Sequence, residues 1–164
     1  MSWQPGATSG TATPAEQYAD LQRALGGLLA GEQDWIANTA NFAALVFTMV
    51  PNLNWAGFYF LRGEELVLGP FQGRPACVRI ALGRGVCGTA AAQRATVLVP
   101  DVHTFPDHIV CDGASRSELV IPLIKGTALL GVFDLDSPLP GRFNAIDQAG
   151  IETAVRALLA ACKI

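Results

Sequence analysis

The chain has 164 residues, of which 51% are hydrophobic and 15% are charged, and its formal net charge is −3. This length suits one domain with a sizeable core, and the acidic balance excludes the basic surface that binds nucleic acid. No apolar run approaches the roughly 18 residues of a membrane span, and the first residues lack the pattern of a secretory signal. We therefore expect a cytoplasmic protein with no membrane partner, whose thiols are kept reduced.

The N-terminal half begins with a tail and two helices. Residues 1–13 are rich in Ser, Thr, Gly and Pro and are expected to form a disordered tail, followed by a single domain over 14–164. Thr13 with Glu16 three residues on predicts a helix start. A second helix is expected from Glu32 or Asp34 to Met49. Its apolar residues on one face are Ile36, Ala40, Ala43, Ala44 and Phe47.

Short apolar segments bounded by turns predict the rest of the domain. The expected strands are 55–61, 66–71, 76–82, 96–100, 117–124 and 128–136, with a glycine loop and short helix at 83–94 and a closing helix at 144–162. Two close pairs of strands predict hairpins. The order of elements predicts an α+β fold, an antiparallel β-sheet with helices packed on one face.

A sixteen-residue loop, "DVHTFPDHIVCDGASR" (101–116), carries Cys111 in a polar setting. Loops this long in compact domains are often functional, so Cys111 is either an inert thiol or one placed to react. The glycines of "GRGVCG" either cradle an anion or only form a turn. Cys87, in the same segment, is expected in the first turn of a helix, where its thiol is either activated by the helix N-terminus or simply packed. Cys77 is expected to begin a strand as a small core residue, and Cys162 to pack in the last helix.

The spacing of the cysteines and histidines does not favour a metal site. Zinc ligands usually occur in pairs two to four residues apart, and Cys77, Cys87 and Cys111 show no such pair. His103 and His108 precede Cys111 in a pattern that matches no common ligand motif. We therefore expect no metal and no organic cofactor.

Acidic and aromatic residues occur in pairs on two of the predicted strands. Asp134 and Asp136 share one face of their strand, and Glu118 lies near them if the preceding strand pairs with theirs. Trp55 and Tyr59 also share a face. The three acids form either a polar cluster in a pocket or a solvated strand end, and the two aromatic side chains either line that pocket or fill core.

Four segments carry a resemblance to a known family. They are "NWAGFYF", "LGPFQGRPACVRIALGRGVCGTAA", "VPDVHTFPDHIVCDGASRSELVIPL" and "GVFDLDSP", and they run in order from residue 54 to about residue 147. The chain resembles the free methionine-(R)-sulfoxide reductases, small enzymes built on a GAF domain. The most specific features are Cys-x9-Cys-x23-Cys, HIxCDxxSxSExVxP and DxDS.

The resemblance implies a substrate and roles for the cysteines. The substrate is free methionine R-sulfoxide, and Cys111 is the nucleophile. Cys77 resolves by forming a disulfide with Cys111, and Cys87 is a secondary thiol able to take part in recycling. Thioredoxin is the implied electron donor, and pairing through terminal helices in GAF-type domains implies a homodimer.

The resemblance also assigns the other site residues. Trp55 and Tyr59 form a cage around the methyl group. Glu118, Asp134 and Asp136 together hold the substrate's amino group and its sulfoxide oxygen. Clustered carboxyls in a dry pocket keep one proton, so on chemical grounds we expect Glu118 and Asp136 to polarise the sulfoxide oxygen and Asp134 to hold the ammonium.

The substrate carboxylate has no obvious arginine partner, so backbone N–H groups near Ile109, Val110 and Cys111 are expected to bind it. Two other functions remain open at this point. One is a sensory GAF module that binds a small ligand without catalysis. The other is a redox switch that uses a Cys77–Cys111 disulfide without turnover.

Overall fold

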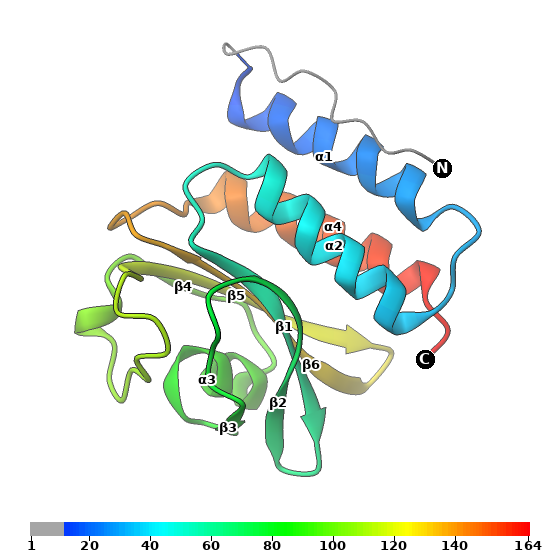
Figure 1. The fold of residues 1–164 in the computed structure, drawn as a ribbon. Helices are drawn as coiled ribbons and strands as arrows, with labels where there is room; N and C mark the ends of the chain where they lie inside the picture. Colours follow the sequence, from blue (N-terminus) through cyan, green and yellow to red (C-terminus); the bar gives the residue numbers. More distant parts are fainter. Residues whose placement is uncertain (1–11) are drawn as a thin grey trace.

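The computed structural model describes residues 12–164, so the predicted tail lies outside the described residues except for its last two positions. The elements are α1 (Pro14–Leu29), α2 (Trp35–Met49), β1 (Trp55–Arg62), β2 (Glu65–Gly73), β3 (Arg79–Ala81), α3 (Gly85–Gln93), β4 (Val97–Val99), a 3-10 turn (Val102–Thr104), β5 (Ser117–Lys125), β6 (Ala128–Ser137) and α4 (Ala145–Ala161). Figure 1 shows their arrangement.

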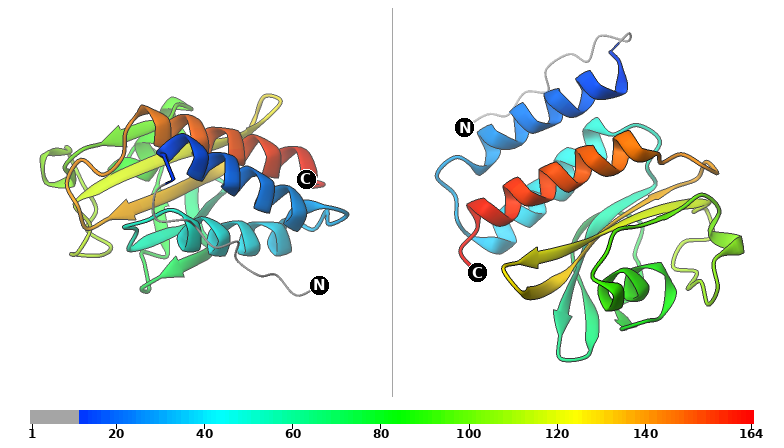
Figure 2. Two further views of the ribbon diagram at one scale, coloured as in Figure 1. Left: turned by 90° about the horizontal axis from the view of Figure 1, so that it is seen from above. Right: turned by 180° about the vertical axis from the view of Figure 1, so that it is seen from behind.

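The strands form one six-stranded antiparallel sheet in the order β3-β2-β1-β6-β5-β4. Helices α2 and α4 cover one face, and α1 lies outside them as a third layer (Figures 1 and 2). The predicted α+β class and both hairpins are confirmed. The short helix α3 lies on the opposite face of the sheet, where the loops also gather. Among residues 12–164, no helix is long and apolar enough to cross a membrane.

The starts of the long helices follow from side-chain caps. Thr13 and Glu16 form the predicted capping box of α1, with the Glu16 amide donating to the Thr13 hydroxyl. Asp34 accepts from the Ala37 amide at 2.8 Å and begins α2. These side chains satisfy amide groups that a helix start leaves without partners. The cap at Thr13 was predicted from sequence, and of the two starts left open for the second helix, the structure has the one at Asp34.

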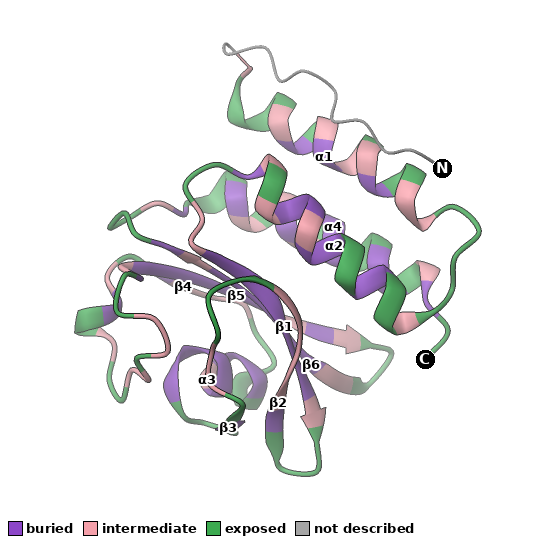
Figure 3. Cartoon of the chain, viewed as in Figure 1, coloured by how far each residue is buried: buried purple, intermediate pink, exposed green. Residues whose placement is uncertain are grey.

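The larger core lies between the sheet and the helices α1, α2 and α4. In Figure 3, the colour for buried residues runs along the central strands and parts of α2 and α4. The rings of Phe42, Phe58 and Phe133 meet there, all with no exposed surface. The Phe133 centroid lies 4.9 Å from that of Phe42 and 4.7 Å from that of Phe58. This aromatic contact fixes α2 on the centre of the sheet.

Phe133→Ala is expected to lower the free energy of unfolding by about 3–5 kcal/mol, because it removes a fully buried ring and leaves a cavity. Urea unfolding checks this value. Ile36→Ala is the control, since Ile36 is 54% exposed and its loss should change the free energy by no more than about 0.5 kcal/mol. Equal effects of both substitutions would contradict this account of the core.

Two local predictions were wrong. The face predicted for α2 includes Ile36 and Ala40, which are exposed, while Phe42 and Val46 are buried. Helix α2 is apolar on most sides, so its apolar residues do not select one face. The third strand is also shorter than predicted, and Cys77 lies in the loop before it. There the Cys77 carbonyl accepts from the Tyr59 hydroxyl at 3.0 Å instead of joining the sheet.

Candidate active site

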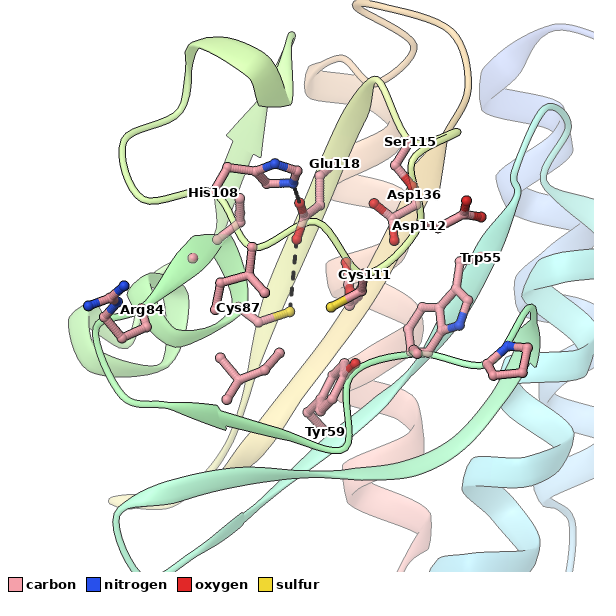
Figure 4. A pocket seen from close by; sticks show the side chains of 17 residues that line it. Trp55, Tyr59, Arg84, Cys87, His108, Cys111, Asp112, Ser115, Glu118 and Asp136 are labelled. Atoms are coloured by element: carbon pink, nitrogen blue, oxygen red, sulfur yellow. Dashed lines mark hydrogen bonds and ion pairs between the residues drawn. The ribbon is translucent and has the colours of Figure 1, made fainter.

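A cavity lies on the α3 face of the sheet, beneath the loop before β3 and the long loop before β5 (Figure 4). Its volume is about 40 Å³. Eight of the ten residues proposed from sequence line it: Trp55, Tyr59, Cys87, Ile109, Cys111, Glu118, Asp134 and Asp136. Cys77 does not line the cavity but bonds to Cys111, which does. Val110 is 68% exposed and lies outside the lining.

The register of the central strands brings the three acids together. Glu118 of β5 lies opposite Asp136 of β6, and Val120 lies opposite Asp134. The alternation of the strands therefore places Glu118, Asp134 and Asp136 on the face that carries the cavity. Of the alternatives that the sequence left open, the polar cluster in a pocket is the one found.

Burial dominates the electrostatics of this cluster. Glu118 and Asp134 are each 6% exposed. Burial, and then the charges of its acidic neighbours, raises the pKa of Glu118 and that of Asp136 well above the usual range, and burial raises the pKa of Asp134 to about 7. At neutral pH the cluster therefore holds protons and can donate hydrogen bonds. The Asp134 Oδ1 atom is buried and has no hydrogen-bond partner among the described residues.

Glu118 lies between a thiol and an imidazole. Its Oε1 is 3.9 Å from the Cys87 Sγ, and its Oε2 is 3.9 Å from the His108 Nε2 (Figure 4). Burial lowers the pKa of His108 and raises that of Glu118, so it disfavours the charged form of both partners. Sequence reasoning considered His108 only as a metal ligand and missed it as a neighbour of the acids. Its place in the HIxCD segment, three residues before Cys111, was the available signal.

Cys77 and Cys111 form a disulfide with their Cα atoms 5.4 Å apart, across a sequence separation of 34 residues. Both are partly exposed at the mouth of the cavity. The fold thus places Cys111 where it forms a disulfide with Cys77.

The other two cysteines are buried and free. Cys87 lies in the first turn of α3, yet burial and the nearby acids raise the pKa of its thiol. Packing therefore outweighs the helix N-terminus, which alone would activate it. Gly88, directly after it, serves the fold, since a Cβ there would lie 2.4 Å from the Ala81 carbonyl oxygen. Cys162 packs in the core on the far side of the sheet, 3.4 Å from the Asn38 Nδ2.

Two aromatic side chains form one wall of the cavity. The rings of Trp55 and Tyr59 stack with centroids 5.8 Å apart, and each residue is 2% exposed. The Trp55 Nε1 donates to the Arg74 carbonyl oxygen at 3.1 Å. The Tyr59 hydroxyl holds Cys77 as described above. Both rings therefore line the cavity and position the loop that carries Cys77.

Polar contacts from Asn54, the residue before β1, hold the long loop over the cavity. The Asn54 side chain donates to Asp112 at 3.1 Å and to the Ser115 hydroxyl at 3.0 Å. The Ile109 side chain reaches toward α3, where a Cβ on Gly85 would lie 3.2 Å from it. Asn54 and Ser115 were not singled out from sequence, because their role depends on contacts between distant segments.

Comparison with known proteins agrees with this architecture. The model of the GAF domain family matches residues 15–161. The chain is 50% identical over 143 residues to the free methionine-R-sulfoxide reductase of Escherichia coli (strain K12), covering 87% of each. It is 40% identical over 144 residues to the free methionine-R-sulfoxide reductase of Saccharomyces cerevisiae, covering 83% of this chain and 80% of the yeast protein.

A solved structure supports the same assignment. The X-ray structure of free methionine-R-sulfoxide reductase from Neisseria meningitidis in complex with its substrate has a TM-score of 0.89 with this chain. The two are 39% identical, and the match covers 95% of this chain and 94% of that one. The chain therefore belongs to the GAF domain family and, within it, to the free methionine-R-sulfoxide reductases.

Proposed function

We propose that this enzyme reduces free L-methionine R-sulfoxide to L-methionine, with Cys111 as the nucleophile. The observation that carries the proposal is the position of Cys111. It bonds to Cys77 at the mouth of a cavity lined by three carboxyls, of which Glu118 and Asp134 are buried and Asp136 is half-buried. A thiol above a proton-bearing acid cluster is the arrangement that sulfoxide reduction requires.

Each part of the substrate has a matching group in the cavity. The stacked rings of Trp55 and Tyr59 are suited to the S-methyl group. The unpartnered, buried oxygen of Asp134 is suited to the ammonium group. Backbone N–H groups near Ile109 and Val110 are assigned to the carboxylate. A methionine sulfoxide within a peptide lacks both terminal charges and would not fit.

The reaction transfers one oxygen atom. Glu118 and Asp136 donate a hydrogen bond or a proton to the sulfoxide oxygen, which makes the sulfur electrophilic. The Cys111 thiolate attacks that sulfur, methionine leaves, and the oxygen ends on Cys111 as a sulfenic acid. The Cys77 thiol then attacks the Cys111 sulfur, so that the disulfide forms and water leaves.

A dithiol reductant must open the disulfide before the next turnover. We assign this role to thioredoxin, by thiol–disulfide exchange at the partly exposed Cys77–Cys111 bond. Cys87, which lies 3.9 Å from Glu118 inside the cavity, is a reserve thiol for this recycling. A cytoplasmic location, a single domain over 14–164 and a homodimer complete the proposal.

Closure of the disulfide also changes the cavity, because Cys111 lines it and then bonds to Cys77 at its mouth. Reduction frees Cys111 and its loop for the next substrate.

Turnover with separate substrates tests the function. We expect methionine formation from free methionine R-sulfoxide, and none from the S-epimer or from N-acetylmethionine R-sulfoxide, which lacks the ammonium that Asp134 binds. NADPH oxidation coupled through thioredoxin and its reductase measures the rate. Absence of turnover with all three compounds would overturn the proposal and favour a redox switch, which forms the disulfide with general oxidants.

A further inference from the structure

Four side chains at the inner end of the cavity form a cluster of metal-type donors: Cys87, Glu118, Asp134 and His108. One ligand atom from each of the first three lies within 4.8 Å of the others, and all three residues are buried. The Cys87 Sγ to Glu118 Oε1 distance is 3.9 Å. His108 adds a fourth donor, with its Nε2 3.9 Å from the Glu118 Oε2.

A second observation indicates that this donor cluster lacks a partner that a cation would supply. The Asp134 Oδ1 atom is fully buried and lacks a hydrogen-bond partner among the residues described. The ion pairs found over residues 12–164 give Asp134 and Glu118 no lysine or arginine. A buried acceptor without a partner is costly, and a cation bound there would supply one.

We propose that the donor cluster binds one Zn²⁺ ion, held by Cys87, Glu118, Asp134 and His108. A thiolate combined with carboxylate and imidazole donors is a set that zinc accepts. Tetrahedral zinc bonds of about 2.3 Å to sulfur and 2.0 Å to oxygen place the two ligand atoms roughly 3.5 Å apart. The Cys87–Glu118 pair is already close to that separation. The ligands come from three distant segments, so tests based on local spacing do not detect them.

Zinc at this position would exclude the substrate. It occupies the carboxyls that the proposed function assigns to the ammonium and to the sulfoxide oxygen. Zinc is therefore an inhibitor that competes with methionine sulfoxide, and this consequence rests on the proposed function. Zinc binding itself does not rest on the proposed function, so either one can fail while the other holds.

Zinc binding to the oxidised enzyme is the direct test. The Cys77–Cys111 disulfide removes two thiols, which leaves Cys87 and Cys162 free. Calorimetric titration with Zn²⁺ should show one site, and Cys87→Ser should weaken it by roughly 100-fold or more, since loss of even a supporting residue costs about 10–100-fold. Cys162→Ser is the matched control, because Cys162 is equally buried but lies across the sheet, and it should leave binding unchanged.

Two further measurements test whether the metal binds at the donor cluster. Co²⁺ in place of Zn²⁺ should give a thiolate charge-transfer absorption band in the oxidised wild type and in Cys162→Ser, but not in Cys87→Ser. Asp134→Asn should also weaken Zn²⁺ binding, with circular dichroism showing that each variant is folded. Absence of binding, or equal binding by the wild type and Cys87→Ser, would overturn the proposal.

Competition is measured in a single turnover of reduced, desalted enzyme, with methionine quantified and no added thiol. Zn²⁺ should slow methionine formation, and excess methionine R-sulfoxide should relieve the inhibition. Inhibition that substrate does not relieve would overturn the competitive mode. Turnover without zinc reports separately on the proposed function.

Discussion

Cys111→Ser is expected to lower turnover of free methionine R-sulfoxide by about 10⁴-fold or more, the scale of loss when a covalent nucleophile is removed. A serine hydroxyl neither attacks the sulfoxide sulfur nor forms a sulfenic acid, so no later step can begin. NADPH oxidation coupled through thioredoxin measures the rate. Cys162→Ser is the control, because Cys162 is a buried free thiol on the other side of the sheet, and it should keep wild-type turnover.

Activity that survives Cys111→Ser would move the nucleophile to Cys87, which lies in the same cavity. Cys77→Ser separates the steps. If Cys77 only resolves, this variant should release one equivalent of methionine and stop with a sulfenic acid on Cys111, which dimedone traps. A burst of that size with slow later turnover would identify the disulfide as a recycling intermediate. Loss of the burst itself would contradict this role for Cys77.

The sequence predicted the sheet well because each strand carries its own local signal. Alternation in "GVFDLDS" placed Asp134 and Asp136 on one face, and pairing of the two hairpin strands brought Glu118 beside them. Helix caps such as Thr13 and Asp34 are equally local. These features depend on neighbours along the chain or across one turn, so they can be predicted from sequence before the fold is known.

The errors come from contacts between distant segments. Cys77 has an extended, apolar setting typical of a strand, but a hydrogen bond from Tyr59 holds it in a loop. Cys87 has the position of an activated thiol, but burial beside acids raises its pKa. His108 approaches Glu118 only because the long loop folds back over the cavity. None of these environments is encoded in spacing alone.

The roles of the acids can be separated by two substitutions that preserve shape. Glu118→Gln removes a proton donor to the sulfoxide oxygen and should lower kcat by about 10²–10⁴-fold, the usual size of general acid catalysis. Asp134→Asn removes the charge that binds the ammonium and should mainly raise KM, by about 10–100-fold, as expected for a hydrogen bond to a charged group. Steady-state kinetics with free methionine R-sulfoxide measures both constants.

Stability provides the control for these two variants. Glu118 and Asp134 are buried, and burial disfavours their charged forms. A neutral amide of the same shape removes that cost, so both variants should unfold at equal or higher urea concentration than the wild type. Lost activity with unchanged or raised stability assigns the carboxyls to function, since sites that serve catalysis are often maintained at the expense of stability. Lost activity with lowered stability would instead indicate that the acids hold the fold, and would contradict their assignment to substrate.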